Sequence, residues 1–260
     1  MQHAVAMRAF DGFVDLVRKS EIIGGDDQAF DHWRAMEYPG EPGVPSCEFE
    51  EYTSVIPLSL HERESRIMEY FQRADLQLSE FFKSVMSHAF GNADALCSTL
   101  ALWSCDACGG DSKDVMPVAA ALECLHRFAS LHDELQSLDA PGPGETTLSV
   151  WGLAQTLNAG DAFHGLALRM LAASGAHPQR ALAVAVMLEE LMLRGIEQRN
   201  RLATASKSGR KRGRRRVLAG LTQPHALGAS LRAGAMMAGA AEEDAQGLYR
   251  AGFRLGMAAA

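Results

Sequence analysis

Apolar residues recur every three or four positions along most of this chain, which is the spacing of one face of an α-helix. The clearest run spans about residues 60–89 and ends at Gly91-Asn92. Further helices are predicted at about 94–108, 112–138, 147–173, 178–205, 225–240 and 242–258. No alternating strand pattern of useful length is present in the sequence. Long helices joined by short Gly- and Pro-containing connections predict an all-α fold, an antiparallel helical bundle.

The chain divides into two parts. Residues 1–58 hold two helix-like stretches and a loop rich in Pro and Gly, and we interpret them as an N-terminal helical extension. Residues 59–260 carry the long helices and form the main helical domain. A basic run at 207–216 interrupts this domain with seven Lys or Arg residues in ten positions. A solvated loop between helices is its plainest interpretation, while contact with phosphates or RNA, or a nuclear targeting signal, stays open.

Composition and charge narrow the function. At 260 residues with a formal charge of −7 at pH 7, the chain is long enough for a substantial core, and nucleic acid is not its expected partner. No run of about 18 apolar residues is present, so no membrane span is expected. The first residues lack the pattern of a signal peptide. Five cysteines are an odd number for a disulfide framework, so free thiols and a cytoplasmic location are expected.

Two of these cysteines, Cys105 and Cys108, have the spacing of a zinc or redox pair. No second Cys/His pair lies nearby in the sequence, and no βαβ pattern surrounds them. On a helix they fall on successive turns and pack readily as small apolar groups. We therefore interpret them as core thiols.

Acidic residues cluster near the end of one otherwise apolar helix. Asp133 and Glu134 are adjacent, and Asp139 follows six residues after Asp133. Carboxylates at such a place are costly unless they are solvated, paired or metal-bound. Hard oxygen ligands with room for water suit Mg²⁺, which in turn suits a diphosphate. From these residues alone, a solvated helix end and a Mg²⁺ site both stay open.

The residues around this cluster resemble the polyprenyl synthetases, the trans-isoprenyl diphosphate synthase family. Its members carry a glutamate, a histidine, a serine-leucine pair and a first aspartate-rich motif. Glu123, His126, Ser130 and Asp133 follow the same order here, and Glu134 replaces the family's second aspartate. The likeness covers about residues 65–260 and implies a bundle of the isoprenoid synthase type.

The resemblance continues beyond the motif. Gly160-Asp161 are similar to a Gly-Asp helix of the family, and Gly195 fits its Gly-Gln…Asp pattern, with Arg199 in place of the aspartate. We interpret Glu189-Glu190, which precede Gly195, as a solvated helix face. The resemblance implies catalytic, Mg²⁺-binding carboxylates and substrate contacts, namely Asp133, Glu134 and Asp139 for the metal and His126, Ser130, Asp161 and Gly195 for the substrate. For His126, a structural role in the core is the alternative.

The sequence also departs from the family. The Gly-Gly-Lys-Arg-x-Arg-Pro segment that holds isopentenyl diphosphate corresponds to residues 92–98, which contain no Lys or Arg. The paired arginines after the motif are replaced by Pro141-Gly-Pro-Gly-Glu-Thr-Thr147, and the later Lys-Thr pair by His225-Ala226. The sequence stops before the position of the second aspartate-rich motif. These changes make standard chain elongation doubtful.

Two functions follow from the resemblance. One is a divergent class I prenyltransferase or terpene-synthase-like enzyme that binds an allylic prenyl diphosphate through Mg²⁺ and lacks a normal isopentenyl diphosphate site. The other is a non-catalytic small subunit that modulates a catalytic prenyl diphosphate synthase. Both imply a dimer, either of two copies or with a catalytic homologue. A third interpretation is that this sequence is a piece of a longer protein.

Overall fold

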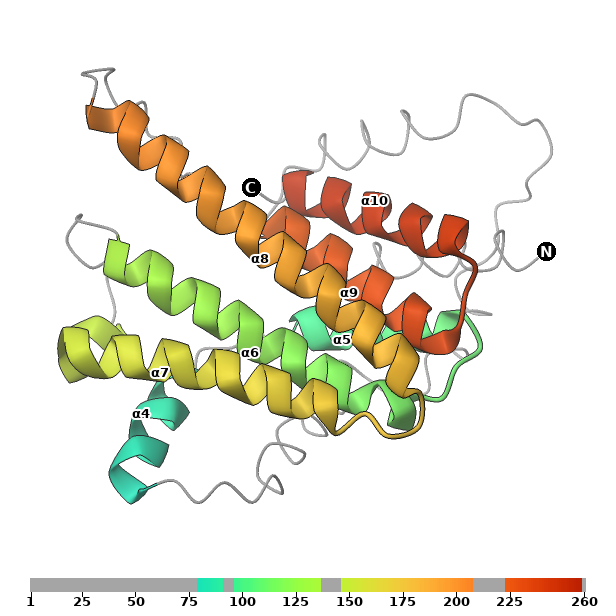
Figure 1. The fold of residues 1–260 in the computed structure, drawn as a ribbon, viewed down its shortest axis with the longest axis horizontal. Coiled ribbons are helices and arrows are strands. Elements are labelled where there is room, and N and C mark those ends of the chain that lie inside the picture. The colour runs from blue at the N-terminus through green and yellow to red at the C-terminus, as the bar shows by residue number, and fades with distance from the viewer. Residues whose placement is uncertain (1–78, 91–95, 137–145, 208–222, 259–260) are drawn as a thin grey trace.

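The protein is built from helices that pack against one another lengthwise (Figure 1). The computed structural model describes residues 79–90, 96–136, 146–207 and 223–258, and every regular element in these ranges is an α-helix. The helices are α4 (Glu80–Phe90), α5 (Leu96–Ala107), α6 (Ser112–Gln136), α7 (Thr147–Ala172), α8 (Pro178–Lys207), α9 (Gln223–Ala238) and α10 (Glu242–Ala258). The predicted all-α bundle is confirmed. The ends of α5 to α10 agree with the sequence expectation to within two residues.

Several expectations concern residues outside these ranges. The N-terminal extension at 1–58, most of the predicted helix at 60–89 and most of the basic run at 207–216 lie there. So does Asp139. The division of the chain at residue 58 therefore stays a prediction.

Glycines end α5 and α9 in the same way. Gly109 and Gly239 have φ values of 80° and 79°, in the left-handed region that residues with a side chain seldom adopt. In each case, the backbone amide of the residue after the glycine donates to a carbonyl of the preceding helix. Gly110 N donates to Cys105 O at 2.9 Å, and Ala240 N donates to Ala235 O at 3.0 Å. These bonds satisfy carbonyls that the helix leaves without an internal partner. Each glycine thus turns the chain sharply into the next helix.

The last two helices, α9 and α10, form the most extensive pair in the bundle, and α9 also packs on α5. Close approach is possible because glycines face backbone: a Cβ on Gly252 would lie 2.7 Å from Leu227 O, and one on Gly234 would clash with Ala101 O. Arg180 of α8 donates from Nη1 to Met237 O at 2.8 Å, which ties the C-terminal end of α9 to α8. The C-terminal helices are therefore an integral part of the core.

A break in α7 was not predicted. Gly152 has φ 76° and ψ 171°, which is not helical, so the first turns of α7 are set at an angle to the rest. Trp151 beside it packs edge-to-face on Phe81 of α4, with ring centroids 5.6 Å apart. The sequence shows only an isolated glycine in a helical pattern, a feature that helices usually tolerate.

Candidate functional site

The acidic cluster lies in the last turn of α6. Asp133 and Glu134 are half-buried there, and this turn contains no basic residue. The C-terminal end of a helix carries a partial negative charge, so carboxylates at this place are destabilised unless a cation or a donor compensates them. Asp139 lies outside the described residues.

One compensating donor comes from the start of α7. Glu134 Oε1 accepts a hydrogen bond from Leu148 N at 2.5 Å, in the first turn of that helix. The hydroxyl of Thr146 accepts from Ser149 N at 3.2 Å in the same turn. The two side chains together satisfy amides that would otherwise have no partner within the helix. Glu134 therefore links the end of α6 to the beginning of α7, a contact that the sequence did not reveal.

His132 joins α6 to the middle of α7. Its Nδ1–H donates to Phe128 O at 2.9 Å, and its Nε2 lies 3.9 Å from Asp161 Oδ1. Because Nδ1 carries the hydrogen, Nε2 is the remaining ring nitrogen and faces the carboxylate of Asp161. Gly160 leaves the space for this ring, since a Cβ there would lie 2.7 Å from His132 Cε1. The Gly160-Asp161 pair, which the sequence resemblance singled out, therefore lies against His132, the residue that precedes Asp133.

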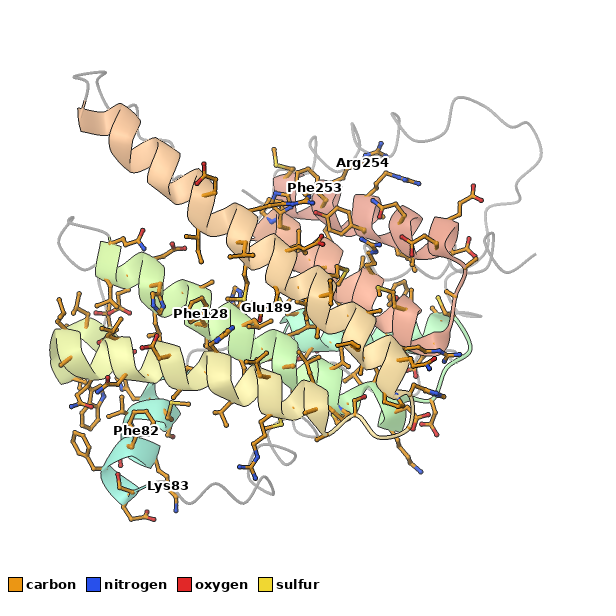
Figure 2. The ribbon with its side chains drawn as sticks, viewed as in Figure 1. Phe82, Lys83, Phe128, Glu189, Phe253 and Arg254 are labelled. Carbon is orange, nitrogen blue, oxygen red and sulfur yellow. The ribbon has the colours of Figure 1, made fainter. Side chains whose placement is uncertain are left out.

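A second histidine connects α7 to α8. His164 Nε2 lies 3.0 Å from Glu189 Oε1, and the His164 ring lies 5.4 Å from the ring of Phe128. Figure 2 labels Phe128 on α6 and Glu189 on α8, which His164 bridges. The Glu189 side chain is 38% exposed, so it keeps solvent contact as expected, and its carboxylate in addition contacts His164 across helices. Glu190 is exposed, as expected.

The remaining predicted substrate contacts are spread over three helices. His126 and Ser130 are half-buried on α6, where the Ser130 hydroxyl donates to His126 O at 2.9 Å within the helix. Asp161 is exposed on α7, and Gly195 is buried in α8. Asp161 comes close to His132 of α6, whereas Gly195 follows Arg194, whose charge acts on residues of α9 and α10. Substrate contact by the four predicted residues stays a prediction.

His225, which stands where the family's Lys-Thr pair is expected, contacts α10. Its Nδ1 lies 2.8 Å from the hydroxyl of Tyr249, and its ring centroid lies 4.8 Å from that of Phe253. Burial, and secondarily the positive charge of Arg194, lowers the pKa of His225. Burial also raises the pKa of Tyr249. The pair is therefore an uncharged hydrogen bond at neutral pH.

Ser98, the last residue of the segment that the resemblance equates with an isopentenyl diphosphate site, contacts a buried carboxylate. Glu123 of α6 is fully buried, and its Oε1 accepts from Ser98 N at 2.8 Å and from Ser98 Oγ at 2.9 Å. Ser98 lies in the first turn of α5, so its amide is a donor that the helix itself leaves without a partner. The start of α5 is thus held by a side chain of this protein.

The cysteines of the described ranges are free thiols. Burial, followed by the nearby Asp106, raises the pKa of Cys105 to about 12. Burial and Asp244 raise the pKa of Cys108 to about 11. Both thiols are protonated at neutral pH, which agrees with their interpretation as core thiols.

Within the ranges that the structure covers, no three His, Cys, Asp or Glu side chains are grouped closely enough to hold a metal ion. Asp139 lies outside these ranges, so the predicted triad remains a prediction. The same ranges contain no helix that is both long and apolar enough to cross a membrane.

Comparison with known proteins agrees with the resemblance. No family model matches the chain. It is 47% identical over 66 residues to the geranylgeranyl diphosphate synthase of Mycobacterium tuberculosis, covering 25% of this chain and 19% of that protein. It is 27% identical over 207 residues to the (2E,6E)-farnesyl diphosphate synthase of Mycobacterium bovis, covering 72% of this chain and 55% of that protein. The chain thus spans about half, or less, of the curated relatives that it matches.

Solved structures show the same fold. The geranylgeranyl pyrophosphate synthetase of the archaeon Geoglobus acetivorans superimposes with a TM-score of 0.64 at 21% identity, over 75% of this chain and 65% of that one. The small subunit of the geranyl diphosphate synthase of Antirrhinum majus gives a TM-score of 0.57 at 20% identity, over 76% of this chain and 80% of that one. The bundle therefore has the fold of these synthases. Together with the sequence matches, it shows that the chain resembles the trans-isoprenyl diphosphate synthase family in sequence and in fold.

Proposed function

We propose that this protein binds an allylic prenyl diphosphate through Mg²⁺ held by Asp133, Glu134 and Asp139. The observation that carries the proposal is the pair of carboxylates in the last turn of α6, at the negative end of the helix dipole, with no basic side chain in that turn. A divalent cation would offset this concentration of negative charge. Carboxylate oxygens are the ligands that Mg²⁺ takes in diphosphate sites, so the donor set fits the metal.

The chemistry that follows is that of a class I isoprenoid enzyme. Bound Mg²⁺ supplies Lewis-acid neutralisation of the leaving diphosphate. Asp133 and Glu134 would orient that group at the open end of α6, and the apolar helices would exclude water from the prenyl tail. His132, held between Phe128 O and Asp161, would fix the direction of the α6 terminus.

A reaction of one substrate is favoured over chain elongation. Residues 92–98 provide no Lys or Arg for a second diphosphate, and the Ser98 amide at the start of α5 already donates to Glu123. An anionic co-substrate at this place would meet a buried carboxylate instead of a cation. We therefore propose a divergent prenyltransferase or terpene-synthase-like activity, such as cyclisation or elimination.

One contact favours a second function, that of a non-catalytic partner subunit. The bond from Leu148 N to Glu134 Oε1 would compete with metal binding by that oxygen. A helix cap is a structural use of the carboxylate that needs no metal. In this case the protein would keep the bundle and modulate a catalytic prenyl diphosphate synthase as its partner. The Antirrhinum majus neighbour is by its name a small subunit of such a synthase, which supports this second candidate.

Turnover assays separate the two functions. The purified chain is incubated with Mg²⁺ and geranyl, farnesyl or geranylgeranyl diphosphate, with and without isopentenyl diphosphate. Release of diphosphate from an allylic substrate alone, lost in Asp133→Asn and kept in the control Glu243→Gln, at an exposed position of α10, supports the enzyme. No turnover by the chain alone, combined with altered product length from an added synthase, supports the subunit. Elongation with isopentenyl diphosphate would contradict the proposal that residues 92–98 do not hold a second diphosphate.

A further inference from the structure

The beginning of α7, Thr147–Trp151, is set apart from the remainder of that helix, and we call it the entry turn. Gly152, which follows it, has φ 76° and ψ 171°, so the entry turn is not in line with the rest of α7. Helical structure resumes directly afterwards, where Thr156 Oγ1 donates to Gly152 O at 2.9 Å. A Cβ on Gly152 would meet nothing within 4 Å, so the glycine is required here by its backbone conformation and not by lack of space. The change of direction is therefore confined to one residue.

A carboxylate of the proposed Mg²⁺ site holds the entry turn to α6. Glu134 Oε1 accepts a hydrogen bond from Leu148 N at 2.5 Å. The other cap of this turn, the hydroxyl of Thr146, accepts from Ser149 N at 3.2 Å. Thr146 directly precedes the entry turn and moves with it, whereas Glu134 belongs to a different helix. A ligand that engages the Glu134 carboxylate would therefore release the entry turn from this contact with α6.

On another side, the entry turn rests on α4 through a contact that leaves polar atoms unsatisfied. The indole of Trp151 lies edge-to-face on Phe81, with ring centroids 5.6 Å apart, and 6.3 Å from the ring of His88. Trp151 Nε1 and His88 Nε2 are both buried, and neither has a hydrogen-bond partner among the described residues. A buried donor without an acceptor costs free energy that water would restore. Phe81 also remains 54% exposed, so the hold of α4 on the entry turn is weak.

A straight α7 is the alternative arrangement of the same residues. Glycine adopts helical dihedral angles about as readily as those that Gly152 has now, and with them the entry turn would continue the axis of α7. Trp151 would then leave Phe81, and its indole N–H would donate to water. The bent arrangement is favoured while Glu134 accepts from Leu148 N. Once that carboxylate is engaged elsewhere, the balance moves toward the straight arrangement.

We propose that the entry turn is a metal-responsive switch, in which Glu134 exchanges Leu148 N for Mg²⁺ and the turn pivots about Gly152 into line with α7. The inference rests on the proposed function, because the same carboxylate serves both contacts. The straight state is favoured by Mg²⁺ since only there is Glu134 free of a competing donor. The helix cap and the metal contact are thus two states of one side chain. Metal loading at the end of α6 is thereby transmitted to the contact between α7 and α4.

The test is the fluorescence of Trp151 in the full chain, taken as the difference between the wild type and Trp151→Phe. Mg²⁺ together with inorganic diphosphate is the probe, and calorimetry on the same samples measures its binding. Binding should move the emission of Trp151 to longer wavelength and increase its quenching by iodide, because the indole passes from α4 into water. Trp151→Phe should bind the probe and show neither change.

Two alanine variants of α7 separate the hinge from a general effect. Gly152→Ala places a side chain at φ 76°, which disfavours the bent state, so without Mg²⁺ its emission should already be that of the loaded wild type. Gly165→Ala is the matched control, because it lies in the same helix and its Cβ also meets nothing within 4 Å. It should respond to the probe as the wild type does. Circular dichroism checks that both variants are folded.

Glu134 supplies a second pair of variants should Gly152→Ala prove unfolded. Glu134→Ala removes the acceptor of Leu148 N and should show the shifted emission without Mg²⁺, whereas Glu134→Gln keeps an acceptor oxygen and should not. Binding of the probe by the wild type without a change at Trp151 overturns the switch and leaves the Mg²⁺ site standing. A folded Gly152→Ala, or in its place Glu134→Ala, with the metal-free emission of its control also overturns the switch. Absence of binding by the wild type refutes the Mg²⁺ site, and the switch with it.

Discussion

Two glycines of α7 allow a direct test of how this helix meets the α6 terminus. Gly160 and Gly165 both lie inside the helix, and alanine at either position would gain about 1 kcal/mol of helix propensity. A Cβ on Gly165 meets nothing within 4 Å, so Gly165→Ala should stabilise the protein by about 0.5–1 kcal/mol. A Cβ on Gly160 would lie 2.7 Å from His132 Cε1 and 2.9 Å from His132 Nδ1.

Any movement of the His132 ring away from position 160 costs free energy. Its Nδ1–H donates to Phe128 O, so rotation away from the methyl group added at position 160 breaks a bond worth about 1 kcal/mol, and overpacking adds about 1–3 kcal/mol. After the gain in propensity, Gly160→Ala should destabilise the protein by about 1–3 kcal/mol. The two variants should thus differ by about 1.5–4 kcal/mol in urea unfolding followed by circular dichroism. Equal stabilities within about 0.5 kcal/mol would refute the packing of His132 against α7.

Three further predictions concern buried groups. Glu123→Ala, which removes the acceptor of two Ser98 donors, should cost about 3 kcal/mol in denaturant unfolding, and Glu123→Gln, which keeps one acceptor oxygen, clearly less; equal losses would argue against the hydrogen bonds. The pKa of His225 is lower in the folded than in the unfolded state, so the unfolded state binds more protons and stability should fall as pH drops below about 6.5; His225→Gln should flatten this part of the stability–pH curve. Cys105 and Cys108 have raised pKa values and should react with a thiol reagent at pH 7 far more slowly than in urea, and equal rates would contradict their packing.

The sequence was sufficient for the helices because strong local signals mark their ends. The glycines at 109 and 239, and Pro178 at the start of α8, define boundaries that the structure reproduces to within two residues. The break at Gly152 escaped prediction because a single glycine inside a helical pattern has two outcomes. Packing of Trp151 against α4 accompanies the break, and no local pattern reveals such a contact.

Only part of the candidate site could be predicted from the sequence. Asp133 and Glu134 stand out locally, as adjacent carboxylates in an apolar helix. The partner of Glu134 is a backbone amide 14 residues away, and Glu189 pairs with a histidine 25 residues away. Such pairs depend on how whole helices are placed, so residue spacing does not identify them. The contact of Glu189 with His164 was not predicted for this reason.

Binding of a prenyl diphosphate through Mg²⁺ at the acidic end of α6 can be measured directly by calorimetric titration of farnesyl diphosphate into the full chain. The titration is run with and without Mg²⁺ for wild type, Asp133→Asn and the control Glu243→Gln. We expect binding by the wild type only with Mg²⁺, unchanged binding by Glu243→Gln, and affinity at least about tenfold weaker for Asp133→Asn. Binding of equal strength without Mg²⁺, or an Asp133→Asn variant that binds as tightly as the wild type, would contradict this expectation.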